Sequence, residues 1–248
     1  MRFILLLFIL LSSSFAVVTV APVTIGQKPG TSGQVNASFQ TQKGNTNFDA
    51  YSGGAKIQYD DNQSYVTWAE FAFDYAEAAG VKNAEDTYSH LRYIHTYRDV
   101  KNVNWEVFAQ AETNQFTNIT ARFITGGGLR FNIHDDELGM FYLGTGAFYE
   151  HINYSTTVDP TENSLRANLY LAYKKDFSKA SSVSYTMYYQ PRANDYKDYL
   201  LLQNLELQVN IYLKLYLSFK LKYIEDARPA VGVKGEDFSQ TTSLVYKF

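Results

Sequence analysis

The sequence predicts an all-β protein, a transmembrane, antiparallel, up-and-down β-barrel of about twelve strands. Three observations predict it. Leu244, Tyr246 and Phe248 lie two residues apart at the end of the chain, so an extended strand places them on one face. The chain starts with a segment that is typical of an export signal. From Gly33 onward, apolar residues recur with a period of two along most of the chain.

The first segment has the three parts of a signal peptide. Met1 and Arg2 are followed by a short apolar run and by small residues that end at Ala16. The run is too short for a spanning helix, which needs about 20 residues. Export and a barrel together predict the outer membrane of a Gram-negative bacterium. The expected parts of the chain are a signal peptide (1–16, with cleavage after Ala21 as an alternative), a periplasmic lead-in (17–32) and a barrel domain (33–248).

Composition agrees with this class and excludes others. The chain has 21 Tyr and 17 Phe, a negative mean hydropathy and no cysteine. The apolar surface of a membrane barrel is spread over alternate residues, which accounts for many aromatics without a second long apolar run. The lack of cysteine excludes a lipoprotein anchor, disulfides and a thiolate metal site. The net charge of -3 argues against nucleic acid as a partner.

Each predicted strand is defined by apolar residues that alternate with polar ones. In the first four strands these are Val35, Ala37 and Phe39; Tyr51, Ala55, Ile57 and Tyr59; Ala69, Phe71, Phe73 and Tyr75; and, more weakly, Leu91, Tyr93 and Tyr97. The next four have Trp105, Val107, Ala109 and Ala111; Phe123, Leu129, Phe131 and Ile133; Phe141, Leu143 and Ala147; and Leu165, Ala167, Leu169, Leu171 and Tyr173. Then follow Val183, Tyr185, Met187 and Tyr189; Leu205, Leu207, Val209 and Ile211; and Leu215, Leu217, Phe219, Leu221 and Tyr223, before the closing strand.

The connections between these strands fall into two groups. If the first strand rises from the periplasm, the predicted outer loops include 78–85, 155–164, 193–199 and 226–236. The predicted inner turns include 60–63, 134–137, 177–180 and 212–214. Long outer loops and short inner turns are the asymmetry of bacterial outer-membrane barrels, and both chain ends then lie in the periplasm.

A soluble barrel with an apolar interior is the alternative architecture. The polar face of the strands carries many full charges, whereas the apolar face has almost none. A basic side chain on a lipid face costs roughly 2–4 kcal/mol at the bilayer midplane, which gives this segregation a physical cause. The pattern therefore favours the membrane barrel.

The chain resembles the salt-induced outer membrane proteins, a family of outer-membrane β-barrels long catalogued as a domain of unknown function. The resemblance is carried by the turn Lys43-Gly44-Asn45-Thr46-Asn47, by Tyr51, Tyr59, Tyr88 and Tyr93, and by the glycines Gly126, Gly127, Gly128, Gly144 and Gly146. It covers nearly all of the chain after the signal peptide. It implies an outer-membrane barrel and no established activity.

The polar face supplies the candidate functional residues, which we expect to line the lumen. The basic ones are Lys56, Arg92, Arg122, Arg130, Arg166, Arg192, Lys220 and Lys222, and the acidic ones are Glu70, Asp74, Glu106, Glu112, Glu150 and Glu206. They indicate either a narrow channel for small polar solutes or a cross-linked polar core that fills the barrel. The second interpretation leaves a non-conducting structural or surface-interaction barrel.

Little in the sequence indicates catalysis, and we expect neither an enzyme nor a cofactor or metal. His134 lies in an Asp-rich turn, and His90 and His95 point to opposite faces of a strand. His151 has no evident partner for an outer-membrane hydrolase, the less favoured alternative. The expected partners are outer-membrane lipid, small polar solutes and the barrel-assembly machinery, for which Leu244, Tyr246 and Phe248 would be the signal.

Overall fold

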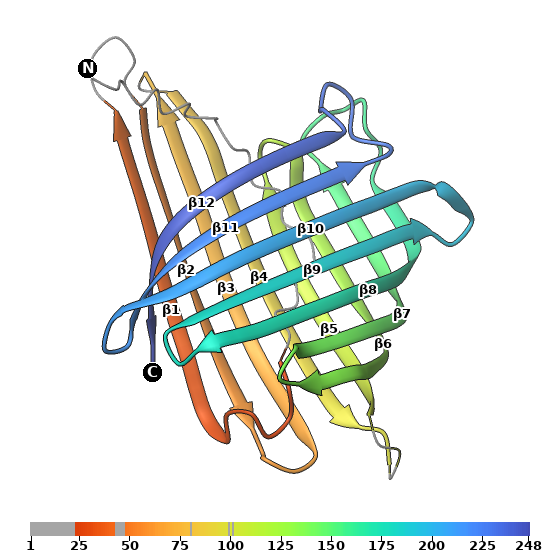
Figure 1. Ribbon diagram of the computed structural model, residues 1–248. Helices are drawn as coiled ribbons and strands as arrows, with labels where there is room; N and C mark the ends of the chain where they lie inside the picture. The colour runs from red at the N-terminus through yellow and green to blue at the C-terminus, as the bar shows by residue number, and fades with distance from the viewer. Residues whose placement is uncertain (1–22, 43–47, 80, 99, 101) are drawn as a thin grey trace, which may run out of the picture.

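The computed structural model describes residues 23–42, 48–79, 81–98, 100 and 102–248. The predicted signal peptide and part of the lead-in lie outside these residues. Twelve strands form one closed barrel (Figure 1). Their bounds are β1 Gly30–Gln42, β2 Phe48–Asp60, β3 Tyr65–Ala78, β4 Val81–Thr96, β5 Val103–Asn114, β6 Ile119–Asp136, β7 Gly139–Tyr154, β8 Glu162–Ser178, β9 Ser181–Arg192, β10 Asp195–Tyr212, β11 Leu215–Asp226 and β12 Glu236–Lys247.

The topology is the simplest that a barrel can have. Every strand pairs antiparallel with its neighbour in the chain, and β1 pairs with β12 to close the ring. The predicted all-β, up-and-down barrel of twelve strands is therefore confirmed. The barrel begins at Gly30, slightly before the predicted Gly33. Among the described residues there is no helix long and apolar enough to cross a bilayer.

The two faces of the wall differ as the alternation predicts. Ile57, Leu91 and Phe123 are more than half exposed on the outside. Arg92 and Arg122, which are adjacent in sequence to Leu91 and Phe123, are buried inside. Because the apolar set faces outward and the charged set inward, the wall has the polarity of a membrane barrel rather than of a soluble one.

The two ends of the barrel differ in their connections. We call the end that carries Gly30 and Phe248 the turn rim; its connections include 61–64, 137–138, 179–180 and 213–214. We call the opposite end the loop rim. Its two longest described connections, 155–161 and 227–235, contact each other, because the Val231 N–H donates to Asp159 Oδ1 at 3.1 Å.

Two of the predicted outer loops are wrong, because the strands there are longer than the apolar pattern suggests. In the expected loop 78–85, β4 already begins at Val81 and pairs with the end of β3. In the expected loop 193–199, β10 begins at Asp195, with a register shift between Asp195 and Tyr199. Backbone pairing extends beyond the apolar belt at the loop rim, where polar residues are no obstacle to a strand. The fourth strand, conversely, ends at Thr96, before the expected Tyr97.

The first turn of the turn rim is fixed by one carboxylate. Asp61 accepts hydrogen bonds from the backbone N–H groups of Ser64 and Tyr65, both at 2.8 Å, and from the Ser64 hydroxyl at 2.6 Å. Partial removal from water acts to raise the pKa of Asp61, but these hydrogen bonds outweigh it and hold the pKa well below its ordinary value. The side chain thus satisfies backbone groups that the end of a strand leaves without a partner.

The seam between β1 and β12 is short. Its register contains Gln34↔Lys247, Val35↔Tyr246, Asn36↔Val245 and Ala37↔Leu244. Gly33 and Phe248 add two backbone hydrogen bonds, of 2.9 and 3.0 Å. A Cβ on Gly33 would lie 2.6 Å from the ring of Phe248, so glycine is needed for that ring to pack there. Beyond Ala37 and Leu244 the two strands diverge toward the loop rim (Figure 1).

Candidate functional site

The lumen holds the candidate site, and its charged residues form layers along the barrel axis. All fourteen predicted lumen residues occupy inward positions of their strands. Arg92, Glu106, Glu112, Arg122, Arg130, Glu150 and Arg166 are buried; Lys56, Glu70, Asp74, Arg192, Glu206 and Lys222 are partly buried; Lys220 is exposed. Half of these charged residues therefore lie out of water, where they require partners.

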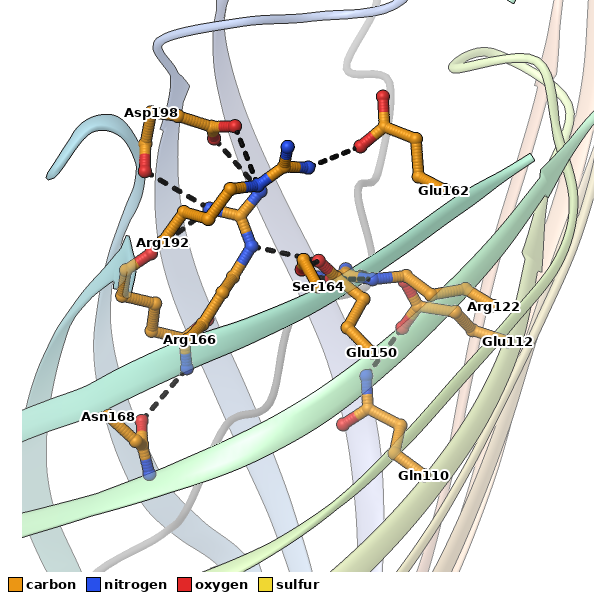
Figure 2. A network of polar contacts seen from close by, with 11 residues as sticks. Gln110, Glu112, Arg122, Glu150, Glu162, Ser164, Arg166, Asn168, Arg192 and Asp198 are labelled. Carbon is orange, nitrogen blue, oxygen red and sulfur yellow. Dashed lines mark hydrogen bonds and ion pairs between the residues drawn. The ribbon is translucent and has the colours of Figure 1, made fainter. Parts of the chain in front are cut away.

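The layer next to the loop rim is a chain of ion pairs (Figure 2). Glu150 is at its centre, because one carboxylate oxygen accepts from Arg122 Nε at 2.7 Å and the other from Arg166 Nε at 2.8 Å. The Ser164 hydroxyl donates to the second oxygen at 2.8 Å. Arg122 also reaches Glu112, at 2.8 Å. Such charge-assisted hydrogen bonds are about twice as strong as neutral ones.

Two acids that the sequence analysis missed extend this layer. Asp198 lies 2.9 Å from Arg166 Nη2 and 3.0 Å from Arg192 Nε, and Glu162 lies 2.6 Å from Arg192 Nη2. Asp198 is inside the register shift at the start of β10. Both acids were missed because 193–199 and 155–164 were expected to be loops, whereas β10 begins at Asp195 and β8 at Glu162, and alternation along these longer strands places both side chains inside.

A second layer lies nearer the middle of the barrel and combines charge with aromatic rings. Arg92 Nη1 is 3.2 Å from Glu106 Oε2, and the Tyr170 hydroxyl donates to Glu106 Oε1 at 2.9 Å. The Arg92 guanidinium also lies 4.8 Å from the centre of the Phe108 ring and 5.9 Å from that of Trp68. A cation over an aromatic face is stabilised by the ring quadrupole, which helps a desolvated arginine.

Arg130 completes this middle layer in a different way. Its guanidinium lies 3.8 Å from the centre of the Tyr142 ring, and its three nitrogens are buried without a hydrogen-bond partner. Gly144 leaves the space that Tyr170 fills, because a Cβ there would lie 2.0 Å from the Tyr170 ring. We refer to Arg92, Glu106, Arg130, Tyr142 and Tyr170 as the packed layer.

The glycines of β6 and β7 do not widen the lumen. The β5–β6 and β6–β7 registers run through them without a bulge. A Cβ on Gly128 would lie 2.3 Å from the Thr145 carbonyl, and one on Gly146 would lie 2.3 Å from the Gly127 carbonyl. They allow neighbouring strands to approach each other closely, and Tyr170 takes the room inside.

A segment before β1 fills the turn rim from within. Val23 is buried in the same apolar cluster as Trp68 and Tyr142. The Gly26 N–H donates to both oxygens of the buried Asp60, at 2.9 and 2.8 Å. The Thr24 hydroxyl forms a further hydrogen bond with that of Tyr142. The part of the predicted lead-in that the structure describes is thus fixed inside the barrel mouth.

Two cavities of about 170 Å³ each remain in the lumen. One opens at the loop rim beside the ion-pair layer and is lined by Glu112, Arg122, Glu150, Arg166, Arg192 and Asp198, among others. The other lies behind the seam and includes Asn36, Glu70, Asp74, Asp86, Lys220 and Lys222 in its lining. The structure therefore divides twelve of the fourteen predicted lumen residues among two cavities and the packed layer.

The remaining predicted lumen residues lie toward the turn rim. Lys56 Nζ is 4.6 Å from the centre of the Trp68 ring. Glu206 accepts hydrogen bonds from Ser218 at 2.5 Å and from Gln208 at 2.8 Å. Both are held by neighbours on the wall rather than by an ion pair across the lumen.

The histidines are dispersed, as the sequence suggested, but one has a partner that we did not expect. His151 Nδ1 lies 2.8 Å from Asn163 Oδ1 on the outward face, where Tyr149 also donates to Asn163 at 2.7 Å. The cross-strand neighbours of His151 are Phe123 and Asn163, and neither has a nucleophilic hydroxyl. Within the described ranges, no group of His, Asp and Glu side chains is arranged to hold a metal ion.

The predicted assembly residues lie on the outward face and at the seam. Leu244 is opposite Ala37 and Tyr246 is opposite Val35, while Phe248 pairs with Gly33. All three side chains are about half exposed. Their position suits contact with lipid, and they contribute to the pairs that close the barrel.

Solved structures with a similar course of the chain are barrels. The translocator domain of the autotransporter NalP from Neisseria meningitidis matches with a TM-score of 0.47 and 11% identity, over 90% of each chain. The NanC porin matches with 0.48 and 11%, over 87% of this chain and 97% of the porin. The KdgM porin gives 0.43 and 11%, over 88% and 99%.

A comparison with curated protein sequences found no match. The profile of one family, described as "Protein of unknown function, DUF481", matches residues 35–248. The match spans β1 to the end of β12 and agrees with the resemblance that the turn, tyrosines and glycines suggested. The chain therefore belongs to this family of unknown function.

Proposed function

We propose that the protein is a non-enzymatic outer-membrane barrel that forms a narrow, intermittently open channel for small polar solutes. The observation that carries the proposal is the arrangement of the lumen, in which a cavity lined by charges of both signs lies between the loop rim and a thin packed layer. The apolar outward face supports the membrane location.

The packed layer would act as the gate. A barrel of about eight strands is filled by its side chains, whereas 16–18 strands leave a wide channel, so with twelve strands the side chains decide. Here Arg92, Arg130, Tyr142 and Tyr188 are fully buried inside the barrel. Arg130 is held by ring stacking rather than by hydrogen bonds, which favours rearrangement of this layer over that of the ion-pair layer. Because acids and bases both line the path, we expect weak ion selectivity.

Removal of lumenal arginines should open the channel. In planar-bilayer recordings we expect brief, low-conductance openings for the wild type and a severalfold higher mean conductance for Arg130→Ala with Arg166→Ala. The loss of two positive charges should also shift selectivity toward cations. Of the single variants, Arg130→Ala should account for most of the conductance because it thins the packed layer.

Lys214→Ala is a matched control, since it removes one positive charge from an exposed turn outside the lumen. Steady conductance of porin size in the wild type would contradict the narrow channel. If neither the wild type nor the double variant conducts, the alternative is favoured, a closed structural or surface-interaction barrel. The segment that fills the turn rim and the joined loops 155–161 and 227–235 are the observations that favour this alternative.

A further inference from the structure

The wall of the barrel is incomplete on one side. The seam register ends at Ala37↔Leu244, although β1 continues to Gln42 and β12 begins at Glu236. We call the space between residues 38–42 of β1 and 236–243 of β12 the lateral slot. In Figure 1, β12 turns away from β1 along this part. The slot lies in the half of the wall nearer the loop rim.

Backbone groups along the slot have no partner strand across it. Gly33 and Phe248 exchange two hydrogen bonds, so every second residue counted from this pair points its N–H and C=O groups across the seam. Continued register would pair Phe39 with Thr242, which the strands do not do. Unpaired backbone in contact with hydrocarbon is strongly unfavourable. A polar occupant of the slot would remove that cost.

The slot is bordered by apolar and polar side chains, because Phe39 of β1 and Phe238 of β12 are exposed on the outward face, while the residues between Phe238 and Leu244 are polar. Residues 239–243 of β12 read Ser-Gln-Thr-Thr-Ser, so both faces of the strand are polar there. Gln240 and Thr242 are exposed on the outward face, where the other strands carry apolar residues. On β1, Gln40 and Thr41 are exposed as well. The stretch 239–243 of β12 is therefore a polar interruption in the apolar wall beside the slot.

A charged cavity lies directly behind the slot. Ser239, Thr241 and Ser243 of the slot line it, together with the charged residues Asp74, Asp86, Lys220 and Lys222. Lys220 is exposed although it occupies an inward strand position. Asp86 is buried, and while its Oδ1 accepts from the Gln115 N–H at 2.8 Å, its Oδ2 has no hydrogen-bond partner. Two lysines and three carboxylates, those of Glu70, Asp74 and Asp86, thus present both signs of charge in a space of about 170 Å³.

We propose that the lateral slot admits the head group of a phosphoethanolamine lipid from the bilayer, with its acyl chains remaining outside. Lys220 and Lys222 would bind the phosphate, and Asp74 and Asp86 the ammonium group. At about 30 Å³ per water molecule, the cavity has the volume of about six waters, which is close to the size of a head group of about eight non-hydrogen atoms. The proposal rests on the membrane location but does not require the channel to conduct.

Native mass spectrometry of the full chain, extracted from vesicles of defined composition, tests the binding. We expect phosphatidylethanolamine to be retained about tenfold more than phosphatidylglycerol, which lacks the ammonium group, and than phosphatidylcholine, which cannot donate to Asp86. Lys220→Gln with Lys222→Gln, and separately Asp86→Asn, should abolish this preference. Lys214→Gln, an exposed lysine at the turn rim, is the matched control and should retain it. Equal retention of the three lipids by the wild type would overturn the proposal.

A disulfide across the slot distinguishes entry of the head group through the wall from entry through an end of the barrel. The chain has no cysteine, so Phe39→Cys with Thr242→Cys introduces one defined pair. The same folded protein is measured before and after oxidation, which keeps the test independent of assembly. Closing the slot should remove the retained lipid, whereas a control disulfide between Ala37→Cys and Leu244→Cys, which are already opposite each other, should not. If the closed variant still retains phosphatidylethanolamine, or if soluble phosphoethanolamine displaces the lipid equally well from both forms, the lateral route is wrong.

Discussion

Deletion of Phe248 is expected to prevent the barrel from closing, so that little or no folded protein reaches the membrane. Phe248 contributes two backbone hydrogen bonds to Gly33 at the start of a seam that has only four further registered pairs. Leu244→Asp should act in the same direction, because it places a charge on the outward face at the last of these pairs. Both changes affect the weakest junction of the wall.

Membrane fractionation followed by unboiled gel electrophoresis measures this effect, since a folded barrel migrates differently before and after boiling. Leu213→Asp is the matched control. It introduces the same charge in place of the same residue type, but in an exposed turn at the turn rim. Normal yield of folded protein from both seam variants would contradict the prediction. A wild-type product that is soluble, or that migrates identically before and after boiling, would contradict the membrane barrel itself.

Glu150→Gln is expected to cause the largest loss of stability among substitutions in the lumen. Glu150 is fully buried and binds Arg122 and Arg166 at once. A glutamine of the same shape removes the negative charge and leaves two buried guanidinium groups short of one counter-charge. Breaking a buried pair by removal of one partner costs about 3–5 kcal/mol, and we expect the free energy of unfolding to fall by that amount.

Urea unfolding in lipid vesicles, followed by tryptophan fluorescence, measures the change. Glu162→Gln is the control, because Glu162 binds only the partly exposed Arg192 and such a pair contributes about 1 kcal/mol or less. Equal effects of the two substitutions would mean that the ion-pair layer is well hydrated. In that event, the cavity at the loop rim would be an open vestibule and the network would not hold the barrel together.

The fold was predictable because a membrane wall imposes one rule on every strand. Because lipid lies outside and polar groups lie inside, apolar and polar residues alternate, and this alternation is visible in the sequence even where it is as weak as in β4. That rule placed all fourteen charged residues inside without knowledge of their partners. It also placed Trp68, Tyr170 and Tyr188 on the inner face, although nothing in the alternation indicated that they would pack together there.

What the sequence could not predict depends on how far the strands extend and what they pair with, rather than on which face of the wall a side chain occupies. Asp198 was missed because 193–199 was expected to be a loop, whereas β10 begins at Asp195. Val23 and Thr24 were assigned to a periplasmic lead-in, since a segment rich in Pro, Gly and Thr carries no periodic signal. The lateral slot was missed for a related reason. Alternation shows which way a side chain points, but not how many residues of β1 and β12 remain opposite each other.

The short seam also determines where a purification tag can be attached. Residues added after Phe248 would extend the chain from the position at which β12 pairs with Gly33, and would compete with the contacts that close the ring. A tag close before Val23 would lie next to a segment that is fixed inside the barrel mouth by Asp60. The loop 227–235 is the better place, because Gly232 within it has open space around its Cβ position and no strand pairing depends on it.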